Sequence, residues 1–319
     1  MSKRNFSLSI FLFLLLFLVQ CKKDKEIVLS QNPTTDSIKI DSALVPKPEI
    51  VQKIKLNYQA FIFPKKKKDS AMSVFKEKYS EEEQYTILAI NRLDTKNRWR
   101  ADTLVVPDTL NVDFLVYSPF PKSMNTLKNI DKIAFFSYAI HAFAIYENGN
   151  QIKWGPTSMG KKSTPTKKGL TFANWKKELS ISSVNSSWKL RWNFNVYNHL
   201  GIGWHQYDLP GFHASHSCLR LLEEDAKYLY TWAEIWKLDD TRSKVLGKGT
   251  PVYIFGDSDF KTKPWRKLLK DANANDISEA DLSKEIEPYV SNILEEQKNS
   301  KYLQNLAFKK TPKVEKNGN

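Results

Sequence analysis

One cysteine lies among residues that could activate it as a nucleophile. Cys218 has His216 two positions before it and Arg220 two positions after it, and His205 lies upstream. The chain has only 5 histidines and 2 cysteines in its 319 residues. A thiolate attacks carbonyl carbon when a base takes its proton and nearby cations stabilise its charge. The residue types around Cys218 therefore predict covalent cysteine chemistry.

An extended backbone from His216 to Arg220 would place His216, Cys218 and Arg220 on one face and the intervening leucine in the core. Two cations beside a thiol would lower its pKa from about 8.5 toward neutrality or below. A turn at 209–211 could bring His205 over Cys218. One histidine would then take the proton while the other supports the oxyanion, and the spacing does not decide which.

Two other interpretations of this segment stay open on the residues alone. Cys218 could be a small core residue, or it could join the histidines in a zinc site. Structural zinc sites usually take ligands from two separated pairs, so we expect no metal and no cofactor. His213 is expected to be a solvent-facing loop residue.

The N-terminus predicts export. Lys3 and Arg4 precede an apolar run over 6–19, which is shorter than the ~20 residues of a membrane-spanning helix. The run ends at Cys21 in a pattern that resembles the cleavage box of bacterial lipoproteins, where the cysteine receives lipid. We expect a signal peptide over 1–20 and a polar tether over 21–55; the alternative is an uncleaved anchor. If Cys21 is lipidated, Cys218 has no partner for a disulfide.

The net charge of +14 does not indicate nucleic acid. Many lysines lie in the flanking segments, and the sequence contains neither zinc-finger spacing nor a glycine-rich phosphate loop. We therefore expect no nucleic-acid partner.

The middle of the chain, 130–256, predicts a mainly β domain. Residues 147–150 read as a tight turn between strands, and strands are expected at 188–197 and 251–255. Acidic residues at the start favour a helix over 223–237. The charged tail over 257–319 is expected to be partly helical, with Pro288 kinking or breaking it, and it either docks or lies loose.

A small α+β unit is expected over 70–110. Ser80 and Glu83 form a capping box, and 103–107 reads as a strand. The stretch 87–107 resembles the second half of a LysM glycan-binding module. The alternative is a helix–strand spacer that packs on the main domain.

The segment 209–221 resembles the signature of L,D-transpeptidases with a YkuD-type catalytic domain, which has an upstream His, then Ser-His-Gly-Cys, an aliphatic residue and Arg or Asn. The stretches 143–149, 158–169 and 225–230 resemble further landmarks of that family. Ser217 stands where the family usually has glycine, so a positive φ there would strain the loop by about 1–3 kcal/mol.

This resemblance implies a β-sandwich in which Cys218 attacks a peptidoglycan tetrapeptide stem, releases D-alanine and passes the acyl group to an amine, giving a 3-3 crosslink. It implies that His205 is the base, oriented by a carbonyl near Gln206, that His216 steadies the oxyanion, and that Arg220 holds the loop or a substrate carboxylate. The expected substrate-binding residues are Trp204, Tyr207, Gly211, Ser215 and Ser217.

The sequence is compatible with two functions besides this transpeptidase. Water in place of the amine would make the protein a carboxypeptidase or a hydrolase that releases wall-linked protein. A decayed site would leave a non-catalytic peptidoglycan-binding scaffold. In each case we expect the protein on the periplasmic side of the cell envelope, lipid-anchored, with the outer membrane assigned by analogy.

Overall fold

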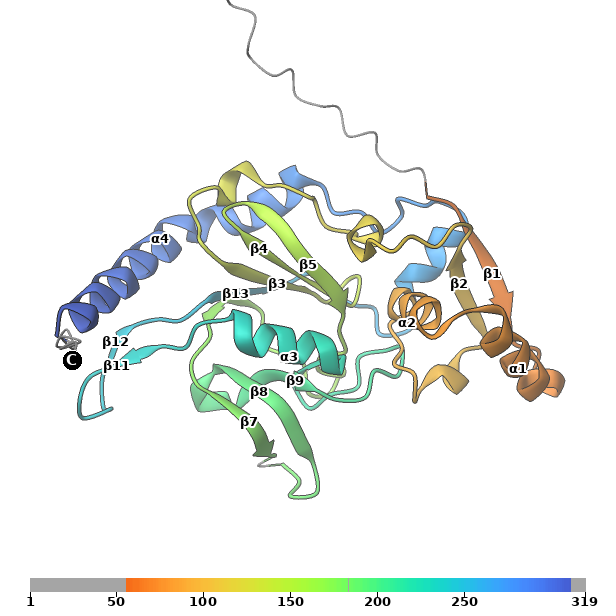
Figure 1. Cartoon of the computed structure of the whole chain (residues 1–319), viewed down its shortest axis with the longest axis horizontal. Coiled ribbons are helices and arrows are strands. Elements are labelled where there is room, and N and C mark those ends of the chain that lie inside the picture. The colour runs from red at the N-terminus through yellow and green to blue at the C-terminus, as the bar shows by residue number, and fades with distance from the viewer. Residues whose placement is uncertain (1–55, 183, 311–319) are drawn as a thin grey trace, which may run out of the picture. The chain divides into compact units, whose positions relative to one another are not determined.

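The computed structural model describes residues 56–182 and 184–310 (Figure 1). The expected signal peptide, the whole tether and Cys21 lie outside these residues. Within them, no helix is both long enough and apolar enough to cross a bilayer.

Two β-sheets form the middle of the chain. The first has the order β5-β4-β3-β13-β6, in which only β3 and β13 run parallel. The second has the order β10-β9-β8-β7, in which β9 and β10 run parallel. The strands are β3 (Ile133–Ser137), β4 (Ala142–Glu147), β5 (Asn150–Pro156), β6 (Gly169–Phe172), β7 (Lys176–Ile181), β8 (Lys189–Tyr197), β9 (Ile202–Gln206), β10 (Leu219–Leu221) and β13 (Pro251–Phe255).

Aromatic and aliphatic side chains from both sheets share one core. Phe136 and Phe143 of the first sheet pack with Trp204 and Leu219 of the second, all 0% exposed. The rings of Phe136 and Trp204 stack with centroids 6.2 Å apart. This packing confirms the expected mainly β sandwich, and it fixes strand β9, which carries His205, and strand β10, which follows Cys218.

The turn at 147–150 is confirmed as the connection of β4 to β5, with positive φ at Asn148 and Gly149. Helix α3 (Glu223–Trp232) begins as predicted and packs on β8 and β9, but its predicted end at 237 is wrong. After Trp232 the backbone bonds instead to other loops, with Trp236 N donating to Asn174 O and Thr250 N to Glu234 O. Strands β11 (Lys237–Leu238) and β12 (Val245–Gly247) follow.

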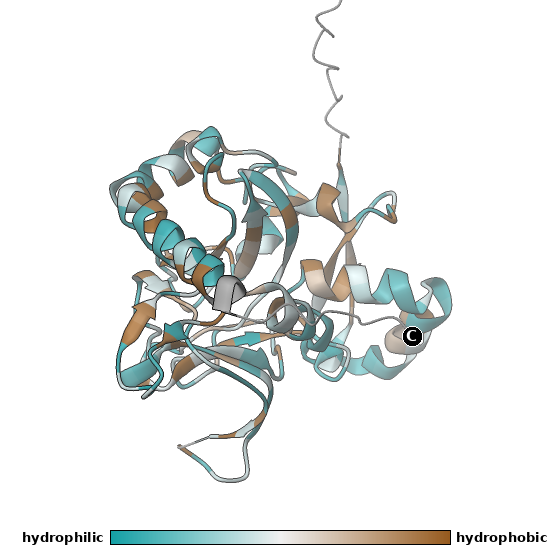
Figure 2. Cartoon of the chain, turned by 60° about the vertical axis from the view of Figure 1, so that its left-hand side comes forward, coloured by the Kyte–Doolittle hydropathy of each residue, from teal (hydrophilic) through white to brown (hydrophobic). Residues whose placement is uncertain are grey.

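The C-terminal helix α4 (Glu279–Lys310) continues through Pro288, so the expected break is absent. Leu282, Ile286 and Ile293 are buried against the first sheet. Burial of each side chain contributes about 1.5–3 kcal/mol, which offsets the cost of about 3 kcal/mol for proline inside a helix. The tail therefore docks over this stretch, and Figure 2 shows hydrophobic residues alternating with hydrophilic ones along α4.

The N-terminal segment folds as a βααβ unit. Strand β1 (Tyr58–Ile62) pairs antiparallel with β2 (Thr103–Pro107), and α1 (Lys68–Lys78) and α2 (Glu81–Ile90) lie between them in sequence. The capping box of Ser80 and Glu83 is confirmed at the start of α2. Phe63 and Phe75 belong to this unit's own small core.

Candidate active site

Parallel pairing of β9 and β10 brings the upstream histidine to the cysteine segment. His205 is the register partner of Arg220, and Trp204 is the partner of Leu219. Paired residues in a sheet point to the same face, so His205 and Arg220 share one face while Trp204 and Leu219 point into the core. Cys218 lies immediately before β10, two residues before Arg220.

The backbone before Leu219 differs from the expected extended run. Strand β10 begins only at Leu219, and Ser217 has φ +80°. A neighbouring loop holds the backbone in this conformation. Gly160 forms an isolated β-bridge with Ser215, and the Thr166 hydroxyl donates a hydrogen bond to Ser217 O. The positive φ that we expected where the family usually has glycine is therefore present at Ser217, although this residue has a side chain.

His205 is held as a neutral imidazole. Its side chain is 3% exposed, and Nδ1–H donates to Gln206 O at 2.9 Å. That bond leaves Nε2 as the unprotonated nitrogen of the neutral ring. Burial, with the Arg220 charge as a smaller cause, lowers the pKa of His205 to about 4, although the bond to Gln206 acts in the opposite direction. His205 can therefore accept a proton at neutral pH.

The Cys218 thiol is not the preformed thiolate that we expected. Burial raises its pKa above the ordinary value, and the Gly203 backbone and the Arg220 guanidinium only partly offset that rise. Cys218 is a free, half-buried cysteine with Sγ 4.0 Å from Gly201 O. A thiol that is protonated at rest needs a base to take its proton before its sulfur can attack a carbonyl.

His216 lies at the edge of the site and is uncharged. Its ring lies 5.0 Å from Trp188, and the Lys161 ammonium donates to Nε2 at 3.3 Å. Desolvation, followed by the charges of Lys161 and Arg220, lowers the pKa of His216. With Nε2 accepting, the neutral ring carries its proton on Nδ1, which is buried and has no partner among the described residues.

Arg220 is half-buried beside the loop that follows β9. Its guanidinium carbon lies 4.6 Å from the centre of the Tyr207 ring, and Nη1 donates to Asp208 O at 3.4 Å. The Tyr207 ring in turn lies edge-on to His205 at 5.8 Å. Tyr207 thus lies against both Arg220 and His205.

Two expected substrate-binding residues lie inside the protein. Trp204 is 0% exposed in the core, so its side chain does not wall a groove. Ser215 is buried, and its hydroxyl donates to Cys218 O at 2.5 Å, which supports the backbone at Cys218. Gly211 has φ +80° and donates to Arg92 O, so it shapes the turn. Phe212 beside it is 47% exposed.

The solvent-facing position expected for His213 is wrong. Its side chain is 4% exposed, accepts from Met159 N at Nδ1 and donates to Tyr138 O from Nε2, both at 3.0 Å. It stacks on His141 at 3.6 Å. These contacts tie the cysteine segment to the loop after β5, so His213 supports the site from within.

Sequence reasoning missed several supporting residues. Tyr138 and Thr166 bond to each other and to the loops around Ser217, and Asp94 bonds to the loop that carries Tyr207. They are ordinary polar residues far from Cys218 in sequence, so no local pattern marks them. Among the residues that the structure describes, no group of His, Cys, Asp and Glu is placed to hold a metal.

Two substitutions at Ser217 separate strain from hydrogen bonding. Ser217→Ala removes the bond from Oγ to Thr164 O (3.2 Å) and keeps the strain, whereas Ser217→Gly removes both. We expect the glycine variant to be more stable than the alanine variant by about 1 kcal/mol in urea unfolding. Equal stabilities would show that the positive φ costs nothing.

Acidification is expected to destabilise the fold through its buried histidines. The pKa of His205 and that of His213 are lowered to about 4, and the pKa of His141 is lowered well below 6.5, in each case mainly by burial. The unfolded chain binds these protons near pH 6.5, so stability is full above 6.5 and falls as pH drops toward 4, by up to about 1.4 kcal/mol per group and pH unit.

Urea unfolding between pH 7.5 and 4.5 measures this loss. His141→Phe keeps the stacked ring and removes one titrating group, so it should flatten the profile relative to the wild type. A variant profile as steep as that of the wild type would contradict this assignment for His141.

Comparison with known proteins supports the domain assignment. Residues 131–254 match the family model described as the L,D-transpeptidase catalytic domain, YkuD. A search of curated proteins found no match. Solved structures similar to this chain include an L,D-transpeptidase from Stackebrandtia nassauensis, at 22% identity over 41% of this chain and 58% of that one, with a TM-score of 0.33.

Another is the L,D-transpeptidase LdtMt1 in complex with imipenem, at 22% identity over 39% of this chain and 59% of that one, with a TM-score of 0.32. A third is L,D-transpeptidase 3 from Mycobacterium tuberculosis, at 19% identity over 40% and 61%, also with a TM-score of 0.32. The chain thus spans less than two thirds of the length of these structures. Residues 131–254 are thus similar to the YkuD-type L,D-transpeptidase catalytic domain.

Proposed function

We propose that this protein is a cell-envelope L,D-transpeptidase that uses Cys218 as its nucleophile. The observation that supports this most is the neutral His205 paired with Arg220 across β9 and β10, two residues after Cys218, with Nδ1 bonded to Gln206 O and Nε2 left to accept a proton. The match of residues 131–254 to the catalytic domain supports the class of reaction.

The proposed reaction has two acyl transfers. Cys218 Sγ attacks the carbonyl of the third residue of a tetrapeptide stem while His205 takes the thiol proton. His205 returns that proton to the departing amine, so D-alanine leaves and a thioester remains. An amine of a second stem then attacks the thioester, forms the 3-3 bond and gives its proton through His205 back to the thiolate.

Neighbouring groups would serve the transition state. His216 Nδ1–H, which has no partner among the described residues, is an N–H donor for an oxyanion. Among the described residues, the Arg220 guanidinium has a hydrogen bond only from Nη1, to Asp208 O, and its other N–H groups would hold a stem carboxylate. Lipid attachment at Cys21 and placement on the periplasmic side remain part of this proposal.

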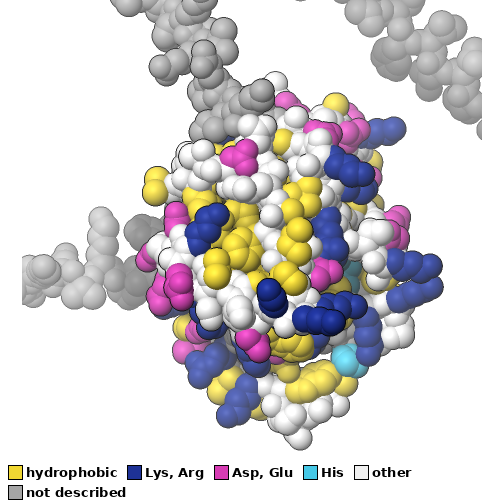
Figure 3. Space-filling view, turned by 90° about the vertical axis from the view of Figure 1, so that its right-hand side faces the viewer, with side chains coloured by type: hydrophobic (Ala, Val, Ile, Leu, Met, Phe, Trp, Pro, Cys, Tyr) yellow, Lys and Arg dark blue, Asp and Glu magenta, His cyan; other side chains and the backbone are white. Residues whose placement is uncertain are grey.

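The βααβ unit packs on the catalytic domain, as the spacer interpretation requires. Ala89 of α2 packs with Leu209 and Leu222, and Leu93 bridges Pro210. Figure 3 shows the side of the molecule that carries this unit, where hydrophobic side chains lie beside lysines and arginines. The exposed apolar residues of the βααβ unit include Ile62, Val74 and Trp99. We retain glycan binding as a second role for this surface.

Analysis of digested sacculi tests the proposed function. Sacculi treated with the wild-type protein should yield 3-3 crosslinked dimers together with free D-alanine, as read by mass spectrometry of the fragments. Tripeptides without such dimers would mean that water is the acceptor and would replace the transpeptidase assignment with a carboxypeptidase.

A further inference from the structure

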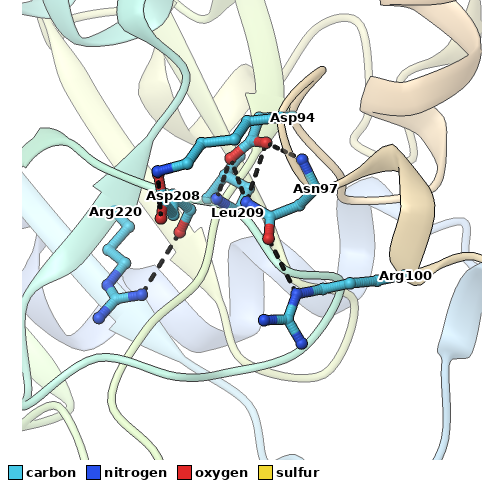
Figure 4. Close-up of polar contacts among 7 residues, drawn as sticks. Asp94, Asn97, Arg100, Asp208, Leu209 and Arg220 are labelled. Atoms are coloured by element: carbon cyan, nitrogen blue, oxygen red, sulfur yellow. Dashed lines mark hydrogen bonds and ion pairs between the residues drawn. The ribbon is translucent and has the colours of Figure 1, made fainter.

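Two loops from different parts of the chain lie side by side next to the candidate active site. The loop after α2 carries Asp94, and the loop after β9 carries Asp208 and Leu209 (Figure 4). Asp94 N donates to Leu209 O at 3.1 Å, and Leu209 N donates back to Asp94 Oδ2 at 2.6 Å. Gly211 N donates to Arg92 O as well. The loop after β9 is therefore held by the βααβ unit.

The Asp94 carboxylate is the centre of these contacts. Besides Leu209 N, it accepts from Asn97 N at 2.6 Å and from Asn97 Nδ2 at 2.9 and 3.0 Å. Asn97 is 6% exposed, and its Oδ1 accepts from Arg100 Nε at 2.9 Å. Hydrogen bonds to an ionised carboxylate are roughly twice as strong as neutral ones, so Asp94 fixes the Leu209 peptide firmly.

The peptide that Asp94 holds leads directly to Arg220. Asp208 O, in the peptide bond whose N–H Asp94 accepts, is the acceptor for Arg220 Nη1. Tyr207, one residue earlier, lies under the guanidinium, and its N donates to Leu221 O. A shift of the Asp208–Leu209 peptide would therefore move both contacts that orient Arg220.

We propose that Asp94 is a positioning residue for Arg220, so that the βααβ unit completes an active site whose catalytic domain lies in residues 131–254. This proposal rests on the proposed function in one respect, which is that Arg220 takes part in the reaction of Cys218.

The nearby ion pair between Lys96 and Asp208 does not fix the loop in the same way. Lys96 Nζ lies 3.2 Å from Asp208 Oδ2, but the two side chains are 77% and 41% exposed. Exposed pairs of this kind contribute little because water and salt screen them. Lys96→Ala is thus a control on the same loop that leaves the Asp94 contacts in place.

The test compares four variants of the full chain with the wild type. Asp94→Ala removes the carboxylate. Asp94→Asn keeps the size of the side chain but points an NH₂ group at the N–H groups that Asp94 accepts from. Lys96→Ala is the first control. Asp239→Ala is the matched control, because that aspartate also accepts several hydrogen bonds, all from partners within 239–244.

Two rates are measured by mass spectrometry of the peptide that contains Cys218, after digestion of protein shown to be folded by circular dichroism. One is alkylation of Cys218 by iodoacetamide as a function of pH, and the other is acylation of Cys218 by imipenem at pH 7. A loosened Arg220 would stabilise the thiolate less, so Asp94→Ala should move the alkylation profile to higher pH and slow acylation roughly 10-fold or more. A merely structural role would leave the alkylation profile unchanged.

Asp94→Asn should show the same changes to a smaller extent, and it carries the test if the alanine variant does not fold. Both controls should match the wild type. Folded Asp94 variants with wild-type profiles and rates would overturn the proposal. The alkylation shift does not depend on what the enzyme does to sacculi, so a wild-type protein that forms no 3-3 dimers would refute the proposed function without deciding the role of Asp94.

Discussion

Cys218→Ala is expected to abolish release of D-alanine from stem tetrapeptides and formation of 3-3 dimers, with a loss of roughly 10³-fold or more. No other residue on this face can form the thioester, because His205 and Arg220 beside it do not form a stable acyl product. The side chain is small and only half-buried, so the variant should fold. The measurement is D-alanine released per minute from purified tetrapeptide, with thermal unfolding as the control for folding.

Cys218→Ala also separates an enzyme from a scaffold. A non-catalytic wall-binding protein would work equally well with alanine at 218, so full complementation of a deletion strain by the variant would exclude the enzyme proposals. The matched control is His199→Ala, because His199 is an exposed histidine whose loss should change nothing.

His205→Asn is expected to lower the acylation rate by about 10²–10⁴-fold. The asparagine amide can still donate to Gln206 O, so the local backbone is kept, but the variant has no nitrogen to take the thiol proton. The measurement is the rate of Cys218 acylation in stopped reactions at pH 7. A loss of less than about threefold would mean that another group is the base.

The pH dependence of acylation in the wild-type protein is expected to follow the pKa values of His205 and Cys218. The competent form has a neutral His205, whose pKa is lowered to about 4, and a protonated Cys218, whose pKa is raised. Acylation should therefore hold a broad plateau through neutral pH and fall only as pH approaches 4. A resting thiolate–imidazolium pair would instead need a charged His205, and burial beside Arg220 opposes that charge.

Local rules predicted the elements that depend on neighbours in sequence. The turn before Asn150 follows from Asn148 and Gly149, which adopt positive φ readily, and the start of α2 follows from Ser80 and Glu83. The motif around Cys218 and the pattern of strands were enough to indicate the fold and the class of domain. These signals work because each is complete within a few residues.

The features that the sequence did not predict depend on distant contacts. His213 is buried because Met159 N and Tyr138 O satisfy its two nitrogens. The pKa of the Cys218 thiol rises because the effect of burial exceeds the stabilisation of a thiolate by the Gly203 backbone and Arg220. Helix α4 passes through Pro288 because its apolar residues dock on the first sheet. None of these partners is near its target in sequence.

The most direct test of a nucleophilic Cys218 is the mass of the protein after incubation with imipenem, a β-lactam whose ring carbonyl acylates a nucleophile. The predicted result is one added imipenem per chain, with peptide mapping placing the added mass on the peptide that contains Cys218, and none in Cys218→Ala. Well-folded wild-type protein that gains no mass, or that gains it on another residue, would contradict the assignment of Cys218 as the acylated residue.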